Sequence, residues 1–265
     1  MTQQTHLQRL LQLAQGVLFP EPGIRRILLA FGYGILCHLV FAMALIAMIW
    51  MMFFGMSRSF GAVPQPWAIL ANAFLVLQFP LAHSLLLSRK GRRYLGWLAP
   101  QREGARLSTT SFAIVASVQL LALFTLWTPS GIVWWQATGT AFFALCTAYA
   151  AAWLLLIKAT WDAGMEVQSG ALGWMSMAAG RTPVYPPMPQ RGTFRLIRHP
   201  IYLSFALTLW TVPVWTPDQL ALAVTLTIYC LAAPILKERR LSRRFGNEFH
   251  EYKRRTPYML PRRRV

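Results

Sequence analysis

Charged residues are scarce in this sequence, and acidic residues are scarcest. Only 13% of the 265 residues are charged, with 8 Asp and Glu against 26 Lys and Arg. A soluble domain carries about a quarter charged residues, so the composition argues against an ordinary soluble protein. Hydrophobic residues make up 55% of the chain and gather in long runs. Because such runs are typical of helices that cross a bilayer, we expect an all-α, polytopic membrane protein.

Cysteine is also rare, with only Cys37, Cys146 and Cys230 in the chain. All three fall within apolar runs and no two of them form a CxxC pair. This pattern indicates neither a disulfide framework nor a zinc site. No other cluster of metal ligands stands out in the sequence, so we expect no bound metal.

The N-terminal segment lacks the apolar core of a cleavable signal peptide, which would lie within the first 26 residues. Between residues 6 and 19, leucine and alanine recur at near-helical spacing. This spacing favours a cytoplasmic amphipathic helix on the membrane surface. The alternative is a frayed tail.

Six apolar segments reach or approach the length needed to cross about 30 Å of hydrocarbon. Short turn sequences, TPSG at 128–131 and WTPD at 215–218, join neighbouring segments as helical hairpins. Tryptophans near these turns fit the aromatic belt of a membrane interface. We expect about six transmembrane helices, at residues 27–54, 67–88, 110–128, 133–157, 197–215 and 219–236.

The net charge of +18 is distributed unevenly. With six spans, every Lys and Arg except Arg58 falls on the side that also holds both termini. This positive-inside pattern predicts that both termini are cytoplasmic. It also favours membrane lipids as partners, and because no recognition motif accompanies the charge we expect no nucleic-acid partner. The oligomeric state is left open.

Composition divides the chain into an N-terminal segment at 1–26, a four-helix block at 27–157 and a highly charged part at 158–265. The third part begins with a polar connector at 158–192, where four prolines stop helices and favour extended backbone. The connector is either a plain cytoplasmic link or a lid over a site formed by the last two helices.

The tail at residues 237–265 is strongly basic. Leu241, Phe245, Phe249 and Tyr252 recur at helical spacing, so one face of the tail is apolar. The pattern predicts a basic amphipathic C-terminal helix at the cytoplasmic membrane surface. Its other face carries Arg239, Arg240, Arg243, Arg244, Lys253 and Arg254, and prolines at 257 and 261 end it.

The segment RLIRHPIYLSF, at residues 195–205, places polar residues at the start of an apolar run. The predicted topology puts this segment and Glu238 at the same membrane face. A carboxylate there binds ribose hydroxyls or an amino group, and an arginine grips a carboxylate with two hydrogen bonds. The set suits a polar, zwitterionic cofactor that enters from the cytosol. The simpler alternative is an interfacial anchor, in which Pro200 opens the helix.

Polar groups inside apolar runs are candidate functional residues in membrane proteins. For His38 we favour a structural hydrogen bond to a neighbouring helix. His83 lies near the cytoplasmic end of its predicted span. It is therefore a weaker candidate for the substrate pocket.

The motif RHPIY at 198–202, followed by ERRLSRRFGNEFHEYKRRTPYMLP at 238–261, resembles the paired motifs of the isoprenylcysteine carboxyl methyltransferase superfamily. The resemblance covers about residues 183–261 and extends weakly to 78–94, which is similar to the methanethiol S-methyltransferase branch. It implies an enzyme in the bacterial inner membrane that uses S-adenosylmethionine. Its acceptor would be a small or lipophilic thiol, carboxylate or lipid amine at the cytoplasmic face.

The resemblance and the residue chemistry together define the candidate site. A cationic surround lowers the pKa of a thiol acceptor, a role that suits the two arginines. The candidate catalytic residues are Arg198, Glu238 and Arg255, and the candidate cofactor-binding residues are His199, Pro200, Tyr202, Glu238 and Tyr252.

Three positions depart from the family pattern. Lys237 replaces the first glutamate of an acidic pair, Ser204 replaces a glycine, and Phe249 replaces a tyrosine. Two other functions therefore stay open. One is an NADPH-dependent, sterol-type membrane reductase, which carries a similar RHPxY element. The other, favoured by Lys237, is a non-catalytic relative acting as a lipid-binding or assembly subunit.

Overall fold

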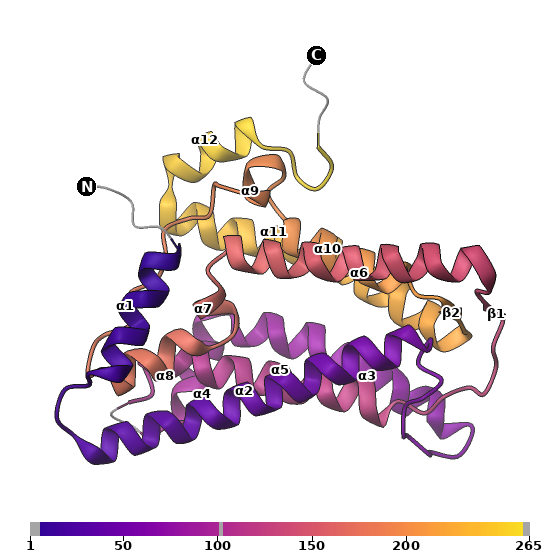
Figure 1. The fold of residues 1–265 in the computed structure, drawn as a ribbon, viewed down its shortest axis with the longest axis horizontal. Coiled ribbons are helices and arrows are strands. Elements are labelled where there is room, and N and C mark those ends of the chain that lie inside the picture. Colours follow the sequence, from indigo (N-terminus) through magenta and orange to yellow (C-terminus); the bar gives the residue numbers. More distant parts are fainter. Residues whose placement is uncertain (1–5, 101–102, 262–265) are drawn as a thin grey trace. The chain divides into compact units, whose positions relative to one another are not determined.

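The computed structural model describes residues 6–100 and 103–261, and its regular secondary structure is almost entirely helical (Figure 1). Five of its helices are long and apolar enough to cross a membrane, which confirms an all-α polytopic protein. The elements are α1 (His6–Leu18), α2 (Ile24–Phe53), α3 (Trp67–Leu86), α4 (Arg89–Trp97), α5 (Ser108–Leu126), β1 (Trp135–Gln136), α6 (Gly139–Asp162), α7 (Met165–Gln168), α8 (Ala171–Ala178), α9 (Thr193–Leu196), α10 (Pro200–Trp210), β2 (Val214–Trp215), α11 (Pro217–Phe245) and α12 (Asn247–Arg255).

The five candidate spans are α2, α3, α5, α6 and α11, close to five of the predicted segments. The remaining segment, predicted at 197–215, forms the shorter helix α10, which has 11 residues. Such a helix is about 16 Å long at 1.5 Å per residue, roughly half the hydrocarbon thickness. Its sequence explains the early end, because Pro213 offers no backbone N–H and cannot continue a helical ladder.

Although α10 is short, it lies alongside α11 with its ends in fixed register. His199 contacts Glu238 at 2.9 Å just before α10 begins. At the other end, Trp210 Nε1 donates to Thr227 Oγ1 at 2.8 Å. The extended residues 211–215 then lead back to the start of α11. Residues 199–215 therefore extend along α11 over the whole length between its first residue and Glu238.

Packing divides the chain into two compact units that interleave along the sequence. The first comprises residues 1–48, 81–122 and 164–186, and the second comprises 49–80, 123–163 and 187–265. The division into consecutive parts ending at 26 and 157 is not tested by this packing and stays a prediction. The first five and last four residues of the predicted terminal segments lie outside the described residues.

In the first unit, the N-terminal segment forms helix α1, which packs against α8 of the connector. Arg9 Nε donates to Glu166 Oε1 at 3.2 Å, and Arg9 Nη2 donates to the Val184 carbonyl at 2.7 Å. Within the same unit, Trp174 Nε1 donates to His38 Nε2 at 3.0 Å. The structural hydrogen bond predicted for His38 is therefore confirmed. The connector carries the short helices α7 and α8, whereas its proline-rich end is extended.

In the second unit, α10 packs against both α6 and α11. Beside these helices, β1 and β2 form a two-residue antiparallel pair in which Trp135 lies opposite Trp215. Next to it, the buried carboxylate of Asp218 accepts hydrogen bonds from Trp127 Nε1 at 3.0 Å and from the backbone and hydroxyl of Ser130 at 2.9 and 2.6 Å. These bonds fix the α10–α11 hairpin at the end away from His199.

The tail is helical, as predicted, but its residues belong to two helices instead of one. Helix α11 runs on through the start of the tail to Phe245, and Gly246 separates it from α12. Gly246 has a φ of 51°, which a glycine adopts without steric cost. The predicted apolar face survives the break, because Phe249 and Tyr252 of α12 pack with Leu241, Phe245 and Met188.

Candidate active site

The polar segment before α10 is held in place by the end of α6. Asp162 Oδ2 accepts hydrogen bonds from the backbone N–H of Thr193 at 2.8 Å and from its hydroxyl at 2.9 Å, and Lys158 also contacts this carboxylate. A side chain at Gly192 would collide with the carboxylate, since an added Cβ would lie 2.2 Å from Asp162 Oδ2. These contacts of Asp162 with Thr193, the Asp162 clamp, fix α9 and therefore orient the chain that leads to Arg198 and His199.

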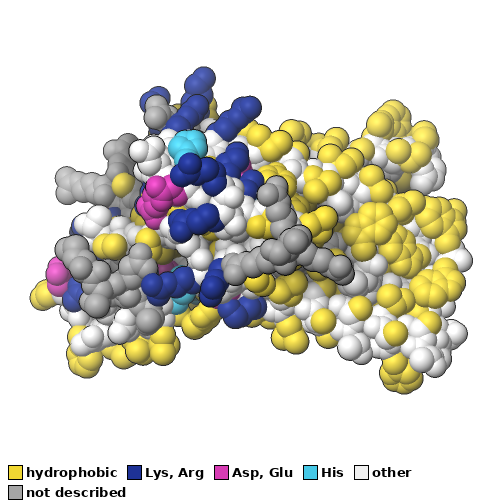
Figure 2. Space-filling view, turned by 90° about the horizontal axis from the view of Figure 1, so that it is seen from above, with side chains coloured by type: hydrophobic (Ala, Val, Ile, Leu, Met, Phe, Trp, Pro, Cys, Tyr) yellow, Lys and Arg dark blue, Asp and Glu magenta, His cyan; other side chains and the backbone are white. Residues whose placement is uncertain are grey.

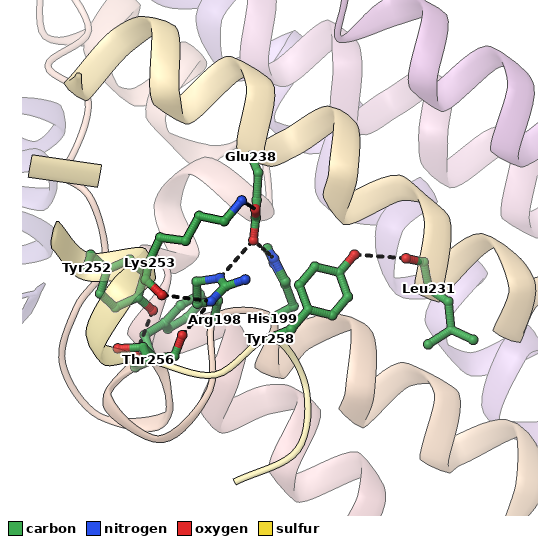
Figure 3. A network of polar contacts seen from close by, with 9 residues as sticks. Arg198, His199, Leu231, Glu238, Tyr252, Lys253, Thr256 and Tyr258 are labelled. Atoms are coloured by element: carbon green, nitrogen blue, oxygen red, sulfur yellow. Dashed lines mark hydrogen bonds and ion pairs between the residues drawn. The ribbon is translucent and has the colours of Figure 1, made fainter. Parts of the chain in front are cut away.

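Arg198 connects the start of α10 to the tail. Its backbone N–H donates to the Pro257 carbonyl at 2.9 Å, and its Nη1 donates to the carbonyls of Lys253 and Thr256. Its Nε donates to Glu238 Oε1 at 2.8 Å. The RHPIY motif, the end of α11 and the tail after α12 are therefore joined by one side chain, as Figure 3 shows.

The carboxylate of Glu238 is the centre of this cluster (Figure 3). Oε1 accepts from Arg198 and faces His199 Nε2 at 2.9 Å, while Oε2 binds Lys253 Nζ at 2.8 Å. The residue is 8% exposed. A buried carboxylate is stable only when it is paired, and here the charges of two cations compensate it.

His199 is buried, with 1% exposure. Its ring is neutral, because a second ring proton, on Nδ1, would be a buried donor without an acceptor among the described residues. The carboxylate fixes the proton on Nε2, because a neutral imidazole must donate to it. Nδ1 is then an acceptor, and it is buried with no hydrogen-bond partner among the described residues.

Two tyrosine rings flank this histidine. Tyr258 lies edge-on to His199, with ring centroids 4.8 Å apart, and Tyr202 lies edge-on at 6.0 Å. The Tyr258 ring also faces the Arg198 guanidinium at 5.5 Å, and its hydroxyl donates to the Leu231 carbonyl at 2.9 Å. Burial raises the pKa of Tyr258, so its hydroxyl stays protonated. The site thus combines a neutral acceptor, a compensated carboxylate and aromatic walls.

The remaining predicted site residues lie as follows. Pro200 occupies the first turn of α10, as expected for a proline that opens a helix. The buried hydroxyl of Tyr252 donates to the Phe194 carbonyl at 2.7 Å, and burial raises its pKa. Arg255 is exposed, and its Nε donates to the Glu251 carbonyl of the preceding turn. His83 belongs to the first unit, where its ring packs against Phe112.

The structure accommodates each departure from the family pattern. The Lys237 ammonium lies over the rings of Phe194 and Tyr202, at 5.6 Å from each centroid. The buried Ser204 hydroxyl donates to the Pro200 carbonyl at 2.7 Å. Phe249 is buried in the apolar face of the tail. Lys237 thus has aromatic neighbours where an acidic pair would have placed a second carboxylate.

Sequence reasoning missed Lys253 and Tyr258. Lys253, whose side chain is half-exposed, looked like one more basic residue of the tail. A helical signal was present, however, because Lys253 lies four residues after the buried Phe249 and so on the same side of α12, whereas Arg255 at six residues does not. Tyr258 follows the end of α12, where no periodicity applies.

The fold and the site define the class of protein: an integral-membrane helical protein with a buried polar cluster at the junction of its last hairpin and tail. No family model matches the chain, and no solved structure matches it. Comparison with curated proteins does find relatives, and they belong to one group.

The chain is similar to methanethiol S-methyltransferase 1 of Bradyrhizobium diazoefficiens, with 28% identity over 89% of the chain and 83% of that protein. It is similar to the methanethiol S-methyltransferase of Pseudomonas deceptionensis at 26%, over 74% of each chain. The protein of that name from Mycobacterium tuberculosis is 24% identical over 76% of the chain and 81% of its own. These similarities confirm the resemblance to the isoprenylcysteine carboxyl methyltransferase superfamily.

Proposed function

We propose that this protein is a membrane methyltransferase that transfers a methyl group from S-adenosylmethionine to a small thiol at the Glu238 cluster. One observation carries the proposal. The residues that match the family motif, Arg198, His199 and Glu238, meet in a single buried cluster (Figure 3). The names of the relatives support methyl transfer and a small thiol acceptor.

The donor set of the cluster fits the proposed cofactor. His199 Nδ1 is a buried acceptor without a partner among the described residues, as expected of a group that meets a ligand's N–H or O–H. The rings of Tyr202 and Tyr258 present aromatic surface beside it. When bound, S-adenosylmethionine supplies an electrophilic methyl group on a cationic sulfonium. His199 and Glu238 would hold it, with Tyr202 packing against it.

The residues of the chain then act mainly by position and charge. Glu238 keeps the proton of His199 on Nε2 and so leaves Nδ1 as the acceptor. Arg198 and Lys253 place positive charge beside the cluster. Positive charge favours the thiolate form of a thiol, which is the nucleophile. In the balanced reaction the acceptor sulfur gains the methyl carbon, its proton leaves to water, and the donor sulfonium becomes a neutral thioether.

Calorimetry on the purified full chain tests the cofactor. S-Adenosylmethionine or its demethylated product should bind at a single saturable site. Binding of NADPH alone would replace the proposal with a reductase, and binding of neither would favour a non-catalytic subunit. We further propose that the site faces the cytoplasm, because the basic residues of the cluster follow the positive-inside pattern.

A further inference from the structure

A second polar feature lies beside the cluster, between the end of α11 and α12. Residues of both helices line an open cleft of about 420 Å³. Pockets that bind small ligands occupy about 300–1,000 Å³, so the cleft has room for a ligand of that class. Glu238 and Lys253 lie at one side of it, and Arg239 and Arg243 line it from α11.

The charge of this cleft is unbalanced. Three cations, Arg239, Arg243 and Lys253, line it against one carboxylate, that of Glu238. Both oxygens of that carboxylate are already bound, Oε1 by Arg198 and His199 and Oε2 by Lys253. Within the described part of the chain, neither Arg239 nor Arg243 forms an ion pair. The two exposed guanidinium groups are thus available to an anion.

Neutral donors and apolar surface complete the cleft. His250 Nε2 and Ser242 Oγ lie 3.1 Å apart and both line it. Ile235, also a lining residue, ends an exposed apolar stripe of α11, since Ile228, Leu231 and Ile235 recur at i, i+3 and i+7 and are 61%, 52% and 51% exposed. Figure 2 shows Lys and Arg side chains gathered on the part of the surface that carries the tail, next to hydrophobic side chains.

We propose that the α11–α12 cleft binds the phosphate of an acidic phospholipid, whose acyl chain lies along the apolar stripe of α11. Guanidinium groups suit the phosphate, because they donate paired hydrogen bonds to its oxygens. The stripe selects a lipid over a free anion, because α11 is a membrane-spanning helix and its exposed apolar face meets hydrocarbon. This proposal does not rest on the proposed function, because the phosphate is held by Arg239 and Arg243, which methyl transfer does not use, although Glu238 and Lys253 border both sites.

The experiment compares two double variants of equal net charge. Arg239→Gln with Arg243→Gln removes the cleft cations, and Arg244→Gln with Arg254→Gln removes exposed cations that do not line the cleft. Native mass spectrometry of the full chain in detergent micelles measures retention of phosphatidylglycerol, phosphatidylcholine and inorganic phosphate. The single variants Arg239→Gln and Arg243→Gln are measured as well, in case the double variant fails to fold.

We expect the wild-type chain to retain phosphatidylglycerol in preference to phosphatidylcholine. The cleft double variant should bind phosphatidylglycerol about tenfold more weakly, each single variant should show part of that loss, and the control pair should bind like wild type. An equal loss in both double variants would mean diffuse attraction and overturn the site. Retention of inorganic phosphate as tight as that of the lipid, or no loss in any cleft variant, would overturn it too.

Discussion

At the scale of single residues, Glu238 is the point at which separate parts of the second unit meet. It links Arg198 and His199 before α10 with Lys253 of α12. A buried residue with three charged or polar partners is sensitive to the loss of its charge, because its partners lose compensation together. Its nearest chain neighbour, Lys237, points instead to aromatic rings, so this position does not supply the second glutamate of the motif that the chain resembles.

We predict that Glu238→Gln weakens binding of S-adenosylhomocysteine about tenfold or more, because hydrogen bonds to charged groups contribute about 1.5–3 kcal/mol. Calorimetry measures the change. Glu248→Gln is the matched control, since Glu248 is an exposed residue whose Oε1 accepts from Gln190. Wild-type affinity in Glu238→Gln would remove this carboxylate from the site.

At the scale of elements, the placement of the RHPIY motif depends on the clamp between α6 and α9. Asp162 fastens the backbone and hydroxyl of Thr193, five residues before Arg198. We predict that Asp162→Ala destabilises this junction by about 1–3 kcal/mol, because the Thr193 N–H loses its acceptor, and that it weakens cofactor binding indirectly. Asp162→Asn, which retains one carbonyl oxygen, should lose less of each.

Limited proteolysis near Gly192, together with calorimetry, measures the Asp162 effect. Faster cleavage with unchanged cofactor affinity would mean that the clamp does not position the site. Glu251→Ala, on the exposed face of α12, is the control for removal of an acidic side chain.

The sequence predicted elements well where one local property decides them. Long apolar runs locate α2, α3, α5, α6 and α11 because hydrocarbon demands continuous apolar helix. Three features escaped prediction, and each depends on neighbours or on backbone geometry. Helix α10 ends early against α11, β1 pairs with a strand some 80 residues later in the sequence, and the tail turns at Gly246.

The candidate site shows the same limit. The motif spacing brought Arg198, His199 and Glu238 together correctly, because both ends of a hairpin meet at one face. It did not single out Lys253 from the other basic residues of the tail, since they all carry the same charge and the charge does not show which of them reaches the cluster. Arg255 was chosen by resemblance, and the break at Gly246 leaves it exposed on α12.

At the scale of the whole molecule, the number of crossings decides where the termini lie. Five long helices alone would put the termini on opposite sides, whereas a crossing at 199–215 puts them on the same side. The register of α10 with α11 favours a crossing, and six crossings would put every Lys and Arg except Arg58 on one side, which is the positive-inside pattern. In such a crossing, the residues from Thr211 onward would supply the depth that the short helix lacks.

We predict that reporters fused to the two termini both indicate a cytoplasmic location. Green fluorescent protein fused to either end should fluoresce, and alkaline phosphatase at either end should be inactive. Alkaline phosphatase inserted beside Arg58 is the positive control. Opposite results at the two termini would mean that residues 199–215 do not cross the bilayer.

Methyl transfer to a small thiol can be followed with a donor labelled in its transferable methyl group. The purified full chain is incubated with labelled S-adenosylmethionine and methanethiol, and volatile product is collected. We expect label in dimethyl sulfide with wild-type protein and at least about a tenfold slower rate with Glu238→Gln, the loss expected from a charged hydrogen bond. No label in the thioether from a wild-type chain that binds the donor would contradict the proposed acceptor and the role assigned to the cluster.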